Sequence, residues 1–264
     1  MKILFIGDIV GKSGRWTVEE FLPKMKETHR PDLVIANAEN LSHGNGFSPK
    51  GIAEMRRAGV NFFTTGDHAW GNRDGMNELG KKDFPVIRPA NFPNEKTPGN
   101  GYEIFQTDLL DKVLVINLIG RVFMKKHYDC PFKAVDKILQ ETANEDLAAI
   151  FVDFHAEATS EKYAMGFYLD GRVSAVIGTH THVPTADLRI LEGGTAFMAD
   201  VGMTGSLDSV IGVNKDIIIN SFLTQLPVKH QIETNGQMVF NAVIVEIDDK
   251  TQKALTVSHL QEIF

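Results

Sequence analysis

Continuous apolar runs alternate with amphipathic stretches along most of this chain, and this alternation constrains its fold more than any other feature. Uninterrupted apolar runs are typical of strands that are buried on both faces. Strands that alternate with helices predict an α/β fold with a largely parallel sheet covered by helices. We expect buried strands at Lys2–Ile6, Leu33–Ala36, Val60–Thr65, Val113–Leu118, Ala148–Phe154 and Val173–Ile177.

Helical spacing of apolar residues marks the stretches between these strands. The first predicted helix spans Arg15–Thr28, and Pro23 is expected to kink or split it. Ser48 followed by a proline is typical of a helix start, and Gly59 is typical of a helix end, so together they bracket a helix at Lys50–Ala58. Further helices are expected at Phe132–Ala143, Thr159–Tyr168 and Asp216–Leu223.

The C-terminal part of the chain has a different pattern. His230–Thr234 and Met238–Ile247 flank an Asn-Gly pair, which is a strong signal for a β-hairpin. Ala254–His259 is expected to add a last strand. These strands suggest an antiparallel edge or a second packed sheet. Arg88–Gly101 is rich in Pro, Gly and Asn and is expected to be a long loop rather than a linker, so we predict one domain over residues 1–264.

Composition and charge exclude several classes of protein. A chain of 264 residues, 43% of them hydrophobic, can bury a sizeable core without disulfides. The single cysteine, Cys130, excludes a disulfide framework, and the N-terminal apolar run is too short for a signal peptide. We therefore expect a cytoplasmic protein with no membrane span. The net charge of −7 argues against long nucleic acid as a partner.

Residues able to bind a metal follow five of the predicted strands. Such a side chain after one strand is ordinary, because turns and caps use the same residue types. Ligands of open α/β sheets bind beyond the carboxyl ends of the strands, so five strand ends would bring these residues to one rim. Coincidence at all five is improbable. The residues are Asp8, Glu39, Asn40, Asp67, His68, His155, His180 and His182.

This set of donors suits two metal ions rather than one. Eight nitrogen and oxygen donors exceed the three or four protein ligands of a single zinc site. Imidazole and carboxylate without thiolate favour manganese, iron or zinc. Two ions roughly 3.5–4 Å apart can clamp a phosphoryl group and activate water. One histidine would then be left to protonate the leaving oxygen.

Several segments that contain these residues resemble a known family. They are GDIVGKSGR (7–15), NAENLSHGNGFS (37–48), RPANFP (88–93), DFHAEATSEK (153–162), YLDGRVSAVIGTHTHVPTAD (168–187) and DVGMTG (200–205). The chain resembles the calcineurin-like metallophosphoesterases, and more closely their YmdB-like bacterial phosphodiesterases. The resemblance implies a four-layer α/β/β/α sandwich with mixed sheets. It also implies hydrolysis of 2′,3′-cyclic nucleotides, with 3′,5′-cyclic ones as further substrates, and self-association into a homo-oligomer.

The resemblance also implies a role for each site residue. It implies a first metal on Asp8, Asn40 and His182, with Glu39 bridging to a second. That second metal would be held by Asp67, His155 and His180. His68 would be the proton donor while a metal-activated hydroxide attacks phosphorus. We expect two transition-metal ions, iron or manganese before zinc.

One position departs from the family pattern. The family motif reads Gly-Asn-His-x-Trp-Asp, whereas this chain has Asp67 in place of the asparagine and Gly71 in place of the last aspartate. An extra carboxylate lowers the positive charge of a two-metal site from about +2 to about +1. Electrostatic stabilisation of the transition state is usually the largest contribution to catalysis at such a site. We therefore predict that metal binding is retained and that turnover is reduced.

Three other functions use the same pocket. The first is a phosphomonoesterase or nucleotidase, which a screen of cyclic and monoester substrates would separate. The second is a nuclease, which the net charge disfavours. The third is a regulatory protein that binds a nucleotide with little or no turnover, an interpretation to which Asp67 lends weight.

Overall fold

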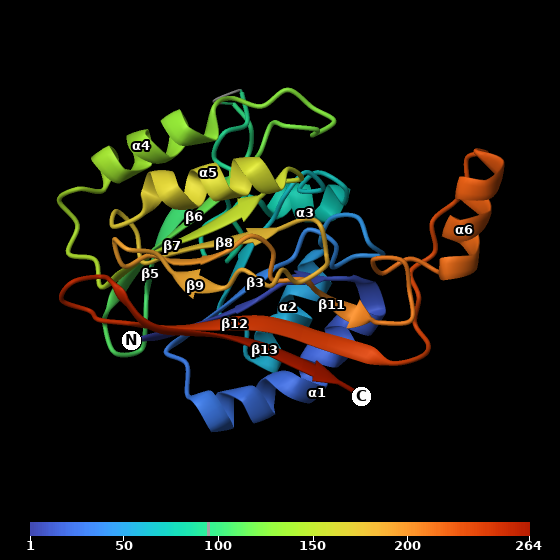
Figure 1. Cartoon of the computed structure of the whole chain (residues 1–264), viewed down its shortest axis with the longest axis horizontal. Helices are drawn as coiled ribbons and strands as arrows, with labels where there is room; N and C mark the ends of the chain where they lie inside the picture. The colour runs from blue at the N-terminus through green and yellow to red at the C-terminus, as the bar shows by residue number, and fades with distance from the viewer. Residues whose placement is uncertain (94–95) are drawn as a thin grey trace.

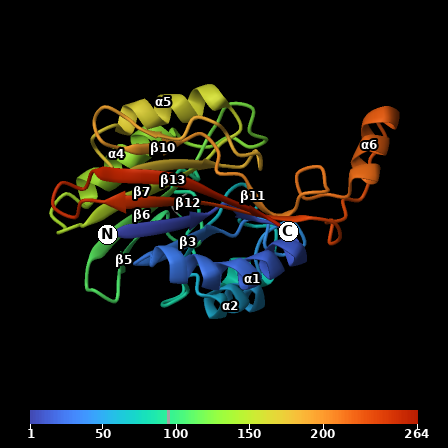
Figure 2. The ribbon, with the colours of Figure 1, turned by 60° about the horizontal axis from the view of Figure 1, so that its bottom comes forward.

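The buried strands divide between two β-sheets that pack face to face (Figures 1 and 2). The structure is a computed structural model and describes residues 1–93 and 96–264. The first sheet contains β1 (Lys2–Ile6), β2 (Asp8–Ile9), β3 (Leu33–Asn37), β4 (Phe62–Thr64), β11 (Met203–Ser206), β12 (Met238–Ile247) and β13 (Ala254–Ile263). The second sheet contains β5 (Tyr102–Gln106), β6 (Lys112–Ile119), β7 (Ala149–His155), β8 (Ala175–Thr179), β9 (Arg189–Ile190) and β10 (Ala196–Met198).

Both sheets are mixed. In the first sheet β1, β3 and β4 are parallel, and β12 runs antiparallel to β1, so that Phe5 lies between Ile35 of β3 and Val243 of β12. In the second sheet β6, β7, β8 and β10 are parallel, and β5 and β9 pair antiparallel at the two edges. The parallel strands of each sheet therefore present their carboxyl ends on a common side.

Helices cover the outer face of each sheet, as Figure 1 shows. The helices of the described chain are α1 (Gly11–His29), α2 (Pro49–Ala58), α3 (Arg73–Glu78), α4 (Pro131–Glu141), α5 (Thr159–Leu169) and α6 (Lys215–Thr224). Of these, α1 and α2 cover the first sheet, and α4 and α5 cover the second. Leu22 of α1 and Met55 of α2 are buried against the first sheet, and Val135 of α4 and Met165 of α5 are buried in the core of the second. The four-layer α/β/β/α sandwich with mixed sheets is thus confirmed.

The core between the sheets joins strands that are distant in sequence. The rings of Phe5 in β1 and Phe151 in β7 lie 5.0 Å apart, and both side chains are fully buried. Burying a phenylalanine contributes roughly 1.5–3 kcal/mol, so this layer holds the two sheets in a fixed relation. One domain over residues 1–264 stays a prediction, and this shared core supports it.

Two of the predicted helices can be compared with the structure in detail. The first helix begins at Gly11 and continues through Pro23, because its buried residues Val18 and Leu22 anchor it to the sheet on the N-terminal side of the proline. The helix after Ser48 forms as predicted: the Ser48 hydroxyl accepts a hydrogen bond from the Gly51 amide, and Gly59 ends it in the left-handed conformation.

The predicted hairpin around Asn235-Gly236 is wrong. His230–Thr234 forms no strand, and β12 instead pairs with β11 through Met238 and Val239 and with β13 along its other edge. Residues 207–237 leave the sheet between β11 and β12 and carry α6, which stands away from both sheets in Figures 1 and 2. The position opposite the start of β12 is already filled by β11, so the preceding segment has no sheet edge to join.

The long loop predicted at Arg88–Gly101 has neither helix nor strand in its described part, and residues 94–95 lie outside the described residues. None of the helices in the described part of the chain combines the length and apolar character needed to span a bilayer.

Candidate metal centre

The predicted site residues come from strand ends of both sheets. Asp8 lies in β2 just after β1, Glu39 and Asn40 follow β3, and Asp67 and His68 follow β4. His155 ends β7, and His180 and His182 follow β8. Parallel neighbours deliver their carboxyl ends to the same edge, so the packing of the sheets brings these groups together.

Four ligand-type side chains surround one point. Single donor atoms of Glu39, Asp67, His155 and His180 all lie within 4.8 Å of one another. His155 Nε2 lies 3.0 Å from Glu39 Oε2, 3.3 Å from Asp67 Oδ1 and 3.0 Å from His180 Nδ1. A side chain at Gly66 would collide with Glu39 and His155, so only glycine permits this approach. Two imidazole nitrogens and two carboxylate oxygens form a donor set that fits manganese, iron or zinc.

A second cluster shares Glu39 with the first and adds Asp8 and His182. Asp8 is fully buried, and its Oδ1 atom has no hydrogen-bond partner among the described residues. Burial raises the pKa of the Asp8 carboxyl to about 6, although His182 and His155 partly offset this effect. A buried carboxylate oxygen without a hydrogen-bond partner is costly unless a cation lies beside it, so Asp8 fits a metal ligand.

The hydroxyl and carboxylate groups behind His155 determine which of its ring nitrogens faces the cluster. Thr179 Oγ1 donates to Asp153 Oδ1 at 2.7 Å. Because the Thr179 hydroxyl has only this one hydrogen, its oxygen accepts a hydrogen bond from the Nδ1–H of His155 at 2.9 Å. His155 Nε2 therefore faces Glu39 and Asp67, on the side from which a cation would be bound. Carboxylate and hydroxyl partners of this kind are typical of histidines that bind metals.

The His-Thr-His turn after β8 is strained and held from behind. His180 and His182 have φ values of 100° and 66°, a region that residues other than glycine rarely adopt. Between them, Thr181 donates its amide and hydroxyl to the Asp200 carboxylate at 2.9 and 2.7 Å. Lys162 completes the arrangement with an ion pair of 2.8 Å to Asp200, and both side chains are buried.

Sequence reasoning missed this support. Lys162 and Asp200 stand in two of the segments that carry the family resemblance, which was the only signal for them. Glu157, in the same segment as Lys162, was missed too. Its carboxylate lies 3.1 Å from His180 Nε2, on the opposite side of the ring from the cluster. Burial, and then the charge of His155, lower the pKa of His180 to about 4, which keeps its imidazole in the neutral form that binds metals.

His68 lies at the edge of the site with 37% of its side chain exposed. Its Nδ1 atom is 2.9 Å from Asn40 Oδ1, and a hydrogen bond to Glu39 raises the pKa of the imidazole. Asn40 turns its amide nitrogen toward Glu39 and His182. Its predicted role as a ligand therefore requires a half-turn of the amide group, and that role stays a prediction.

Comparison with known proteins places this arrangement in a family. YmdB-like proteins match residues 4–260. The chain belongs to the YmdB-like family. A 2′,3′-cyclic-nucleotide 2′-phosphodiesterase of Bacillus subtilis (strain 168) is 44% identical to it over 261 residues, which are 98% of this chain and 96% of that protein. The resemblance found in the sequence is thereby confirmed.

Solved structures agree with this YmdB-like assignment. The crystal structure of a phosphatase from Mycoplasma pneumoniae matches with a TM-score of 0.92 and 34% identity, covering 100% of this chain and 93% of that one. A 5′-nucleotidase precursor from Thermus thermophilus matches with a TM-score of 0.57 and 12% identity, covering 100% of this chain and 54% of that one. The second match shows the shared metallophosphoesterase-type fold alone.

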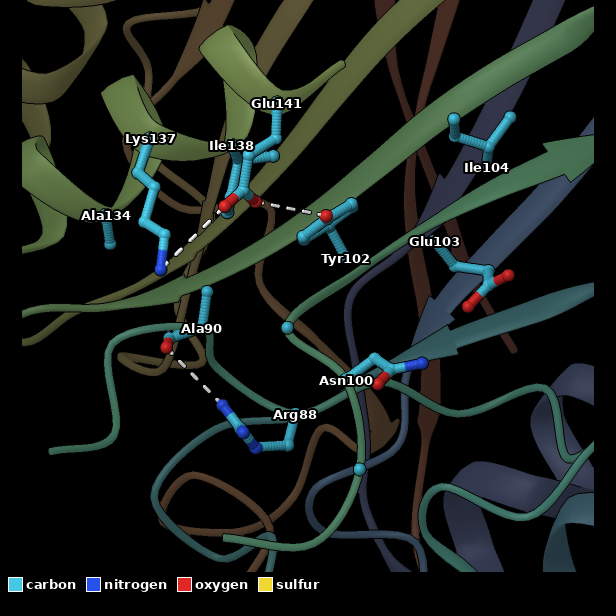
Figure 3. Close-up of a pocket in the computed structure, with 12 residues that line it drawn as sticks. Arg88, Ala90, Asn100, Tyr102, Glu103, Ile104, Ala134, Lys137, Ile138 and Glu141 are labelled. Atoms are coloured by element: carbon cyan, nitrogen blue, oxygen red, sulfur yellow. Dashed lines mark hydrogen bonds and ion pairs between the residues drawn. The ribbon is translucent and has the colours of Figure 1, made fainter. Parts of the chain in front are cut away.

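A separate cavity of about 560 Å³ is shown in Figure 3. Three of its charged side chains, those of Arg88, Lys137 and Glu141, have partners within the lining. Glu141 accepts a hydrogen bond from the Tyr102 hydroxyl at 3.2 Å and pairs with Lys137 at 3.8 Å, and Arg88 donates to the Ala90 carbonyl at 3.4 Å. Because these three side chains are already engaged, we assign this cavity no role.

Proposed function

We propose that this protein is a metal-dependent phosphodiesterase that hydrolyses cyclic nucleotides, 2′,3′-cyclic ones first and 3′,5′-cyclic ones as further substrates. The observation that carries the proposal is the pair of donor clusters that share Glu39. The relative from Bacillus subtilis, named for this activity, supports the choice of substrate. The protein would act in the cytoplasm and as a homo-oligomer.

The described side chains suit two cations, iron or manganese before zinc. Asp8, Asn40 and His182 would hold one, and Asp67, His155 and His180 the other, with Glu39 shared between them. When bound, the cations supply Lewis-acid activation of the phosphate and of the attacking water. The buried Oδ1 of Asp8, which has no hydrogen-bond partner among the described residues, and the direction of His155 Nε2 toward Glu39 and Asp67 support this assignment.

His68 is suited to deliver a proton to the leaving sugar oxygen. It is the most exposed imidazole of the site, so it can reach a substrate that lies on the outer side of the clusters. Its Nδ1 atom is held by Asn40, which leaves Nε2 directed away from that contact. General acid catalysis of this kind contributes roughly 10²–10⁴-fold.

The test is the hydrolysis of 2′,3′-cyclic AMP by protein loaded with manganese or iron. We expect His68→Ala to keep its metal content, counted per chain by elemental analysis, and to lose about 10²-fold or more of the wild-type rate. Equal activity in His68→Ala would reject the proton-donor role. A wild-type protein that binds metal but leaves cyclic nucleotides intact would reject the phosphodiesterase assignment.

Substrate comparison separates the remaining alternatives. Faster hydrolysis of nucleoside monophosphates than of cyclic ones would make the protein a nucleotidase. Binding of cyclic nucleotide without product would make it a regulatory protein, an alternative to which the extra charge of Asp67 lends weight.

A further inference from the structure

An apolar cavity of about 380 Å³ opens directly beside the candidate metal centre. Its volume lies within the range of sites for small organic ligands. Glu39, Asn40, His68, His180 and His182 line one part of it. The remaining wall is mainly aliphatic and aromatic, and it includes Val10, Val213, Ile218, Phe222 and Ile232.

Most of the apolar wall belongs to the segment 207–237, which is tied to the site itself. The carbonyl oxygen of Ile211 lies 2.9 Å from His182 Nδ1. At the other end of the segment, Ser13 Oγ donates to the carbonyl oxygen of Glu233 at 2.8 Å. The segment therefore starts and returns beside the donor clusters, and α6 stands at its outer end (Figures 1 and 2).

Phe222 of α6 is the unusual member of this wall. It is 79% exposed although it lines the cavity, whereas Ile218, one turn earlier, is only 9% exposed. An exposed aromatic ring beside a cavity is a typical feature of a ligand site. A single ligand that satisfies both parts of this cavity needs an anionic group for the metal end and a flat apolar group for the other. Nucleobases have such a face and stack on aromatic side chains.

We propose that this cavity binds the base of the substrate and that Phe222 is a substrate-binding residue that stacks on it. The inference rests on the proposed function, because the phosphate must lie at the metal centre for the base to reach α6. It deepens that function by naming the part of the protein that would bind the base of such a substrate. Stacking tolerates any base, so purines and pyrimidines are both accepted.

The experiment compares one substrate with its base and one without it. The metal-loaded wild-type protein and the variants Phe222→Ala, Phe222→Trp and Leu223→Ala are assayed on 2′,3′-cyclic AMP and on methyl riboside 2,3-cyclic phosphate. Leu223 is the matched control, because it is 80% exposed on the same helix and does not line the cavity. Binding of adenosine 3′-monophosphate by calorimetry gives a readout that needs no turnover.

We expect Phe222→Ala to lower kcat/KM for 2′,3′-cyclic AMP by about 10-fold, mainly through KM, and to weaken nucleotide binding similarly. Phe222→Trp should restore both, Leu223→Ala should change neither, and the base-free substrate should be unaffected. Equal losses on both substrates, or a change in oligomer mass by light scattering, would overturn the inference and assign α6 to an interface between copies. An unchanged KM would also overturn it. If the wild type hydrolyses neither substrate, the proposed function itself fails.

Discussion

Replacing Lys162 with methionine tests how the strained His-Thr-His turn is maintained. The Lys162 ammonium group is buried and lies 2.8 Å from the Asp200 carboxylate, which holds Thr181 by two further hydrogen bonds. Methionine keeps the length and apolar stem of the side chain and removes only the charged end. The variant therefore leaves Asp200 buried without its cation.

The size of the effect follows from what Asp200 retains. Breaking a buried ion pair by removing one partner costs about 3–5 kcal/mol. Asp200 keeps the amide and hydroxyl of Thr181 and the amide of Gly202 as donors, so the lower end of this range applies. We expect a loss of about 3 kcal/mol in the free energy of unfolding. For a chain of this size that loss lowers the melting temperature by about 6–12 °C.

The assay is urea denaturation at pH 7 of chelator-treated protein, so that metal binding does not add to the result. Lys24→Met is the control, because the ion pair of Lys24 with Glu20 lies on the exposed surface of α1. Exposed ion pairs four residues apart on a helix contribute less than about 0.5 kcal/mol to the free energy of unfolding. If Lys162→Met destabilises the protein no more than Lys24→Met does, the buried pair is not what holds the turn.

Two further variants examine the clusters themselves. Thr179→Val keeps the shape of the side chain but removes the acceptor for the Nδ1–H of His155. We expect the metal affinity, measured by chelator competition, to fall by about 10–100-fold. An unchanged affinity would show that the Thr179 hydroxyl does not orient the His155 ring. Asp67→Asn removes one negative charge from the site. We expect metal binding to persist and kcat for 2′,3′-cyclic AMP to rise. An unchanged kcat would refute the argument that the charge of Asp67 lowers turnover.

The strands that position the site residues could be predicted because each buried strand is a continuous apolar run in the sequence. Lys2–Ile6 and Leu33–Asn37 are largely apolar and lie at the centre of a sheet, so their continuous runs predicted both the strand and the position of the polar residue that follows. Short elements had no such signal. Residues Arg189–Ile190 are exposed, and only pairing with β10 makes them a strand.

Long-range partners were the part that the sequence could not supply. Asn-Gly at 235–236 favours a hairpin locally, but β11 occupies the pairing position at Met238, and this competition is visible only in three dimensions. In the same way, no local pattern around Lys162 indicates that its partner is Asp200, 38 positions further along the chain. Pairs of this kind depend on how α5 lies against β8, which is a property of the packed sheets.

The site draws its ligand-type residues from both sheets, and this affects more than catalysis. Asp8 and Glu39 belong to the first sheet and its loops, whereas His155 and His180 belong to the second. Separating the sheets would pull the donor atoms apart, and a cation bound among them opposes that separation. Since such a cation binds only when both sheets are in place, its binding free energy stabilises the whole sandwich rather than one loop. The core between the sheets and the candidate metal centre therefore reinforce each other.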